Sequence, residues 1–128
     1  MTIVTLTTDF GTRDGYVGEM KGVVASLAPD ARLTDVTHGV PAGDVRAGAW
    51  VLDRVWSRFP EGTIHLAVVD PGVGGDRRAV AARAAGRWLV GPDNGLITDV
   101  ASRGGVEAAR ELEPDRVGLE PLSDTFHG

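Results

Sequence analysis

Short runs of β-branched and aliphatic residues alternate along this chain with segments whose apolar residues recur every three or four positions. Short apolar runs are typical of buried strands, and the three-to-four spacing is typical of amphipathic helices. The order strand, helix, strand, helix, strand requires crossover connections between parallel strands, with the helices packed against the sheet. The sequence therefore predicts an α/β domain with a mostly parallel central sheet and helices on both faces, a Rossmann-like arrangement of three layers.

The bounds of the predicted elements follow from these patterns and from the Gly and Pro residues that interrupt them. Strands are predicted over residues 3–7, 32–36 and 63–69, and a hairpin around Gly86 over residues 78–85 and 88–90. Helices are predicted over residues 16–28, 45–59 and 96–102, the second with Asp44 as its N-cap. Residues 106–113 fit either a helix or a strand, and the chain beyond Pro114 is loop-like.

Composition excludes several classes of function. The formal charge is −5 and Lys21 is the only lysine among 13 basic residues, so nucleic acid is not an expected partner. The absence of cysteine rules out disulfides and thiolate zinc sites, and no spacing of other ligands predicts a metal. No apolar run reaches the ~20 residues of a membrane span, and the start lacks a signal peptide's charged region. A single-domain cytoplasmic enzyme is the expectation.

The stretch from Asp70 to Arg78 follows predicted strand 63–69 and reads Asp-Pro-Gly-Val-Gly-Gly-Asp-Arg-Arg. Its aspartate stands at the carboxyl end of a strand, which is where open α/β folds bind their ligands. The glycines of this loop would let backbone N–H groups approach a ligand. The alternative is a surface ion pair between Asp70 and Arg77 that only braces the loop.

Other polar residues follow the predicted strands. Asp9 closes the first strand, where a carboxylate can accept hydrogen bonds from the vicinal hydroxyls of a ribose. Its alternatives are an Asx-turn or a helix cap, although Asp14 is the favoured cap. For Asp93 and Asn94, which follow residues 88–90, turn chemistry with Gly or Asn at positive φ is favoured over a ligand contact.

The three histidines have different settings. His65 lies inside a predicted strand and is expected to be structural, while His38 is in a loop with no evident partner. His127 lies in the sequence Thr-Phe-His-Gly, which could deliver an imidazole to a site, although a terminal loop histidine is more often solvated.

Five motifs in this order resemble one family, the S-adenosyl-L-methionine hydroxide adenosyltransferases, which are related to the fluorinases and chlorinases. The resemblance runs from the first strand to the last residue and so is more specific than any single motif. The motifs are Thr7-Thr8-Asp9-Phe10-Gly11, Gly15-Tyr16-Val17-Gly18-Glu19-Met20-Lys21-Gly22, Asp70-Pro71-Gly72-Val73-Gly74, Gly91-Pro92-Asp93-Asn94-Gly95 and Thr125-Phe126-His127-Gly128.

The resemblance implies hydrolysis of S-adenosyl-L-methionine to adenosine and L-methionine, without a cofactor. It assigns Asp70, Arg77 and His127 to a water-activating triad. It also implies a tyrosine in the halogenases where this chain has Asp70, so a halide-using adenosyltransferase is the alternative activity. The residues it assigns to binding the substrate are Asp9, Phe10, Val73, Asp93, Asn94 and Phe126.

The resemblance also carries expectations about assembly. The family's proteins are longer, homotrimeric, and have a β-rich C-terminal domain after the Thr-Phe-His-Gly motif. Their nucleoside site lies between this domain and the N-terminal domain of a neighbouring subunit. Residues 1–128 are therefore expected to be an N-terminal domain cut from a longer chain, and a non-catalytic adenosine-binding or assembly domain is a further alternative.

Overall fold

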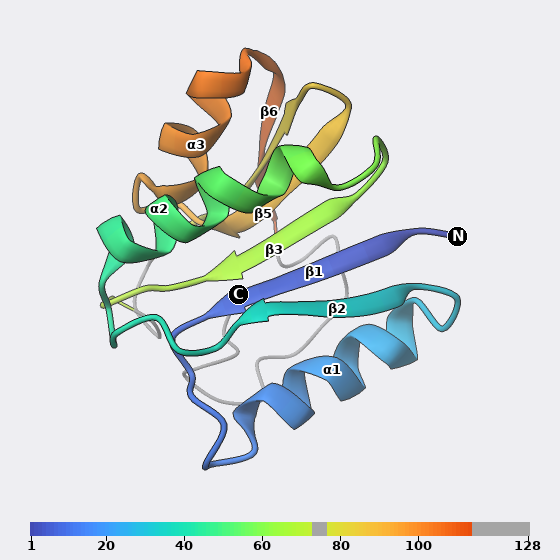
Figure 1. Cartoon of the computed structure of the whole chain (residues 1–128), viewed down its shortest axis with the longest axis vertical. Coiled ribbons are helices and arrows are strands. Elements are labelled where there is room, and N and C mark those ends of the chain that lie inside the picture. Colours follow the sequence, from blue (N-terminus) through green and yellow to red (C-terminus); the bar gives the residue numbers. More distant parts are fainter. Residues whose placement is uncertain (73–76, 114–128) are drawn as a thin grey trace.

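The computed structural model describes residues 1–72 and 77–113, whose strands form one sheet in the order β2-β1-β3-β5-β4-β6 (Figure 1). Four neighbouring strands pair in parallel, and they are β2 (Arg32–Thr37), β1 (Ile3–Thr8), β3 (Ile64–Val68) and β5 (Arg87–Pro92). The last two pairings are antiparallel and involve β4 (Ala79–Ala84) and β6 (Val106–Leu112). The predicted hairpin around Gly86 is thus the β4–β5 turn.

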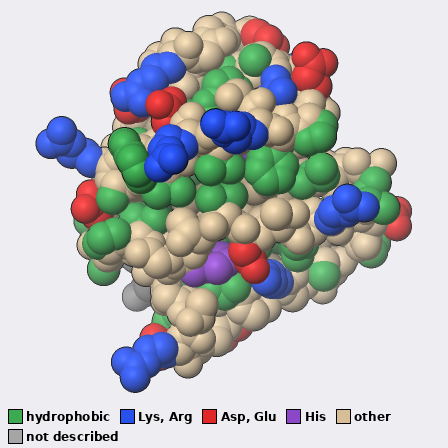
Figure 2. All heavy atoms as spheres, in the orientation of Figure 1, with side chains coloured by type: hydrophobic (Ala, Val, Ile, Leu, Met, Phe, Trp, Pro, Cys, Tyr) green, Lys and Arg blue, Asp and Glu red, His purple; other side chains and the backbone are tan. Residues whose placement is uncertain are grey.

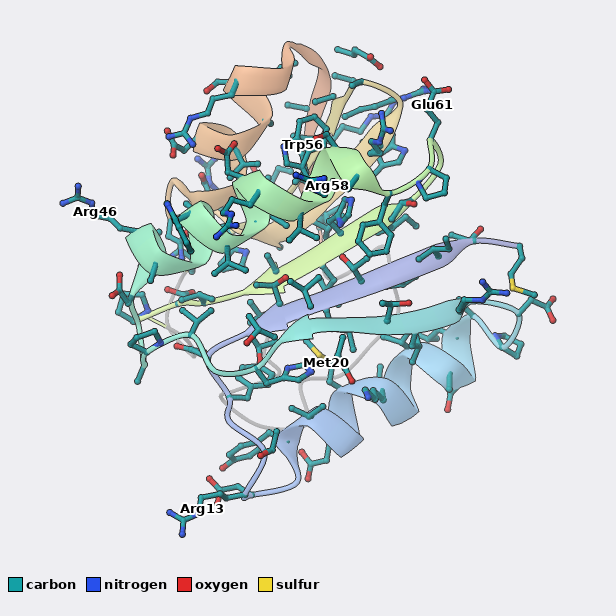
Figure 3. All side chains as sticks on the ribbon, in the orientation of Figure 1. Arg13, Met20, Arg46, Trp56, Arg58 and Glu61 are labelled. Carbon is teal, nitrogen blue, oxygen red and sulfur yellow. The ribbon has the colours of Figure 1, made fainter. Side chains whose placement is uncertain are left out.

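Helices cover both faces of the sheet. On one face, α1 (Tyr16–Leu27) directs Met20 onto Val4 and Leu6 (Figure 3). On the other, α2 (Val45–Val55) and α3 (Leu96–Gly104) pack over β3, β4 and β5. The predicted α/β architecture of three layers is confirmed. None of the helices in the described residues combines the length and apolar character of a membrane span.

The alternation of side chains along the strands explains why both faces are buried. In β1 and β3 the even-numbered positions, such as Leu6 and Leu66, face α1, whereas Ala67 in β3 and Val69, the residue after it, face α2 and α3. Figure 2 shows hydrophobic side chains interspersed with Lys and Arg side chains over the visible surface. Trp50 on α2 is 62% exposed, and the Arg54 guanidinium stacks over its ring.

Three local predictions about helices and strands have different outcomes. Asp44 caps α2 as expected, accepting a hydrogen bond from the Ala47 N–H. The prediction that Asp14 caps α1 is wrong, because the N-cap of that helix is Gly15, whose φ is +77°, and no side chain caps it. The segment 106–113, which was ambiguous, forms the edge strand β6 because it pairs with β4.

The helix predicted over residues 45–59 changes at its end. It stops at Val55 and continues as a 3-10 turn, η1 (Trp56–Arg58). The reason lies in the carbonyl groups of this segment. The Trp56 carbonyl accepts a hydrogen bond from His65, and the carbonyls of Ser57 and Phe59 accept from the Arg87 guanidinium. These side chains satisfy carbonyls that a longer helix would pair internally.

His65 is a structural residue, as expected. It is fully buried, its Nε2 donates to the Trp56 carbonyl, and its Nδ1 accepts from the Thr5 hydroxyl. The pKa of His65 is lowered to about 4, mainly by burial. The hydrogen bond to Trp56 opposes this shift, and the charge of Arg87 adds to it. Both partners therefore suit the neutral imidazole.

This burial predicts a pH dependence of stability. The unfolded chain binds a proton at His65 near pH 6.5 while the native state stays neutral down to about pH 4, so acid favours unfolding in that window. Between pH 7 and pH 5 we expect the parent to lose about 2 kcal/mol more unfolding free energy than His65→Gln, which does not titrate. Urea unfolding at several pH values measures the difference, and equal slopes would contradict the assignment.

Gly91 in β5 predicts a large effect of one added methyl group. A Cβ at this position would collide with the Ala67 carbonyl oxygen and would lie 3.2 Å from the Ile97 side chain. We expect Gly91→Ala to lower the unfolding free energy by about 2 to 3 kcal/mol. The matched control is Gly18→Ala on α1, where no atom lies within 4 Å of the new Cβ. That change should raise stability by about 0.5 to 1 kcal/mol in the same urea titrations.

Candidate functional site

The candidate site residues converge because three neighbouring parallel strands end at one edge of the sheet. Asp9 directly follows β1, Asp70 lies just after β3, and Asp93 and Asn94 follow β5. Ligands of open α/β sheets bind outside such carboxyl ends. The edge formed by the ends of β1, β3 and β5 is called the site edge below.

Asp70 is the buried acid of the site edge. Its side chain is only 4% exposed, and its Oδ1 accepts a hydrogen bond of 2.8 Å from the Gly72 N–H. The same oxygen lies 3.3 Å from Nη2 of Arg77, whose side chain is 34% exposed. A Cβ at Gly72 would lie 2.6 Å from that nitrogen, so the glycine leaves room for the guanidinium. The Asp70 side chain is thus held in place by one backbone donor and one guanidinium group.

Arg77 also joins the Asp70 loop to the turn after β5. Its Nη1 donates to the Asp93 carbonyl oxygen at 3.4 Å, and the Asp93 N–H donates to the Arg78 carbonyl at 2.7 Å. The Asp93 carboxylate pairs with Arg78, which also pairs with Glu111 on β6. The two loops therefore form one connected unit. The alternative of a surface ion pair is met only in part, because Asp70 and Arg77 do pair but the Asp70 side chain is buried.

Asn94 has a clear structural task. Its Nδ2 donates to the Val69 carbonyl at 2.7 Å, and its Oδ1 accepts from the Leu96 N–H at 3.2 Å. The side chain thus ties the end of β3 to the first turn of α3. The following Gly95 has a φ of +95°, so the predicted turn chemistry is confirmed.

Asp9 contacts the loop after β2 and caps no helix. Its Oδ2 accepts a hydrogen bond of 2.6 Å from the Gly43 N–H. Gly43 has a φ of +70°, and a Cβ there would lie 3.1 Å from Cβ of Pro71, the residue after Asp70. The close packing of Gly43 on Pro71 links Asp9 to the Asp70 loop.

The remaining predicted residues divide into two groups. Phe10 packs partly buried against the core that contains Met20 and meets Tyr16 edge-on, with ring centroids 6.3 Å apart. Val73, Phe126 and His127 lie outside the described residues. The structure therefore brings together Asp9, Asp70, Arg77, Asp93 and Asn94.

Sequence reasoning missed His38. The expectation that it has no partner is wrong, because its Nδ1 meets the Thr8 hydroxyl at 2.8 Å and its Nε2 meets Asp35 at 2.7 Å. Hydrogen bonds from Lys21 and then from His38 hold the pKa of Asp35 below its usual value, against a smaller opposing effect of burial. The signal available in the sequence was that His38 directly follows strand β2. Because β2 pairs in parallel with β1, His38 lies next to the end of β1.

Comparisons with known proteins agree with this architecture. A protein-family model described as the SAM hydroxide adenosyltransferase N-terminal domain matches residues 4–128. A solved structure of an uncharacterized conserved protein from Thermotoga maritima aligns with a TM-score of 0.88 and 39% identity, covering 98% of this chain and 48% of that one.

Curated relatives carry two names. A protein of Salinispora arenicola named (R)-S-adenosyl-L-methionine hydrolase is 54% identical over 127 residues, which are 98% of this chain and 48% of the relative. A protein of Methanocaldococcus jannaschii with the same name is 41% identical over 131 residues, with the same two coverages. A protein of Nocardia brasiliensis named fluorinase is 29% identical, and the aligned region covers 98% of this chain and 49% of the fluorinase. The chain spans about half the length of the curated relatives it matches.

The contacts of Asn94 predict that exchanging its amide nitrogen for an oxygen is costly. In Asn94→Asp a carboxylate oxygen would face the Val69 carbonyl in place of a donor, so we expect a loss of about 2 kcal/mol of unfolding free energy. The reverse exchange at the next position, Asp93→Asn, removes only a partly exposed ion pair and should cost under about 1 kcal/mol. Urea unfolding of both variants measures the contrast, and equal losses would refute the structural role of Asn94.

Proposed function

Because the chain belongs to the SAM hydroxide adenosyltransferase N-terminal domain family, we propose that it hydrolyses S-adenosyl-L-methionine to adenosine and L-methionine. The observation that carries the proposal is the buried Asp70 carboxylate, held by Gly72 and Arg77 at the site edge. The names of the hydrolase relatives support the same substrate and point to the (R) epimer at sulfur.

The reaction is a displacement at the ribose C5′ of the substrate. The oxygen of water forms the new bond to C5′, the C5′–S bond breaks, and its electron pair stays on sulfur. Methionine leaves as a neutral thioether, so no acid is needed at the leaving group. The difficulty lies with the nucleophile, because water must lose a proton as it attacks. A positioned base contributes ~10² to 10⁴ in rate to such a step.

Asp70, Arg77 and His127 share the task of handling water. A histidine has an ordinary pKa near neutrality, which suits a base, whereas a carboxylate is ordinarily a weaker base. We therefore assign proton removal to His127 and the orientation of the water or of His127 to Asp70. Arg77 stabilises the hydroxide character that develops on the attacking oxygen. Binding of a pre-formed hydroxide by the same three groups is the alternative form of this mechanism.

Asp9 is the residue that we assign to the ribose hydroxyls. Its Oδ2 already accepts from Gly43, and this contact fixes the orientation of the carboxylate for two hydroxyl donors. We also assign substrate contacts to Phe10, Val73, Asp93, Asn94 and Phe126, on the basis of the family resemblance. Among these, Asn94 would contribute through its backbone or through the turn that it supports.

The choice between water and halide follows from charge. A carboxylate at position 70 can orient and polarise water, but it repels fluoride or chloride. The fluorinase relatives are also less similar to this chain than the hydrolases, at 29% against 54% and 41% identity. Hydrolysis is therefore favoured over halide transfer. We propose in addition that the reaction needs no cofactor. We further propose that the complete site forms between subunits of a homotrimer.

The decisive experiment compares the complete gene product with its Asp70→Asn variant on each epimer of S-adenosyl-L-methionine. Asn keeps an oxygen for the Gly72 N–H but removes the charge that orients water and pairs with Arg77. We expect the variant to lose about 10² to 10⁴ in adenosine release from the (R) epimer, measured by liquid chromatography.

The matched control is Asp30→Asn, an exposed position in the turn before β2, at the opposite end of that strand from the site edge. It should keep the parent rate.

Incorporation of ¹⁸O from labelled water into the adenosine 5′-hydroxyl should identify the nucleophile. Turnover of Asp70→Asn within threefold of the parent would refute the role of Asp70, and 5′-halo-5′-deoxyadenosine formed in the presence of halide would favour the alternative reaction. Adenosine binding without any turnover would identify a non-catalytic domain.

A further inference from the structure

A continuous line of side-chain hydrogen bonds runs from α1 to the end of β1. Lys21 on α1 donates to Asp35 Oδ2 at 2.8 Å, and Asp35 Oδ1 meets His38 Nε2 at 2.7 Å. His38 Nδ1 in turn meets the Thr8 hydroxyl at 2.8 Å. The line thus connects a helix, strand β2, the loop after it and the residue immediately before Asp9.

The chemistry of the groups fixes the direction of each bond. The Asp35 carboxylate only accepts, so Nε2 of His38 carries a proton and donates. With the proton on Nε2, Nδ1 can accept a hydrogen bond from the Thr8 hydroxyl. The Thr8 oxygen accepts in addition from the Phe10 N–H at 3.2 Å. The His38 side chain is 6% exposed, so little water competes for these bonds.

Backbone bonds from the same loop bracket Asp9 on both sides. The Val40 N–H donates to the Thr8 carbonyl at 3.3 Å, and the Gly11 N–H donates to the His38 carbonyl at 2.8 Å. Together with the Thr8 side chain, they hold the residues before and after Asp9. The Asp9 carboxylate itself accepts from Gly43, farther along the same loop.

We propose that His38 is a positioning residue, which holds Asp9 in the orientation that binds the vicinal hydroxyls of the nucleoside. This inference rests on the proposed function, because it takes Asp9 as the ribose ligand. His38 acts through Thr8 and through the loop, and it does not touch the substrate. Asp35 and Lys21 are the charged groups in line with it, and they fix the tautomer that accepts from Thr8.

Two substitutions separate the two ends of the imidazole. In His38→Asn the amide oxygen can take the place of Nδ1 and accept from Thr8, while the contact with Asp35 is lost. In His38→Gln the amide nitrogen can take the place of Nε2 and donate to Asp35, while the contact with Thr8 is lost. A general packing role would make the two variants equally defective, whereas positioning through Thr8 predicts that only His38→Gln is impaired.

The first measurement is steady-state hydrolysis of S-adenosyl-L-methionine by the complete gene product. We expect His38→Gln to raise KM about tenfold while kcat stays within about threefold, because ribose binding contributes alike to the ground state and the transition state. His38→Asn should keep both constants within about threefold of the parent. A fall in kcat with unchanged KM in His38→Gln would overturn the proposal.

The second measurement does not depend on turnover. Hydrogen exchange of the Gly43 amide reports its bond to Asp9, and that of the Leu6 amide reports general loosening of the sheet. We expect His38→Gln to speed exchange at Gly43 about tenfold more than at Leu6, and His38→Asn to preserve both rates. If the parent neither binds nor hydrolyses the substrate, the proposed function fails, and exchange alone still decides whether His38 holds Asp9. Unchanged protection of Gly43 in His38→Gln would refute the inference.

Discussion

The site depends on the parallel pairing of β1 with β3 and of β3 with β5. Parallel neighbours end at the same edge of a sheet, so residues that are about 60 and 20 positions apart in the chain become adjacent there. Asp9, Asp70 and Asp93 each follow one of these strands. Without this pairing, the three acids would belong to unrelated loops.

The loops at this edge are joined by hydrogen bonds, an ion pair and one close packing contact. Asn94 binds the Val69 carbonyl, Arg77 binds Asp70 and the Asp93 carbonyl, and Gly43 packs against Pro71. The contacts of Asn94 with Val69, of Arg77 with Asp93 and of Gly43 with Pro71 each join loops that follow different strands. A substrate that binds at this edge therefore meets an arrangement that is already ordered, which reduces the entropy cost of binding.

Two buried histidines show how the same side chain serves different purposes. His65 and His38 each bond a threonine hydroxyl at Nδ1 and an acceptor at Nε2. For His65 the acceptor is a backbone carbonyl in the core, and burial depresses its pKa. For His38 it is a carboxylate paired with Lys21, and the threonine stands beside Asp9. The neighbouring groups, rather than the imidazole, distinguish a core residue from one connected to the site.

The sequence alone determined the α/β class, nearly all strands and helices and the cap at Asp44, because apolar periodicity and turn residues are local signals. The set of residues expected at the site came from the resemblance of five motifs to one family. It left the segment 106–113 open, placed the end of α2 too late and assigned no partner to His38. These features were decided by groups distant in the chain: β4 pairs with the edge strand, Arg87 and His65 take the carbonyls after α2, and Thr8 and Asp35 receive His38. A hydrogen bond between such groups leaves no periodicity in the sequence, so only the tertiary structure could reveal it.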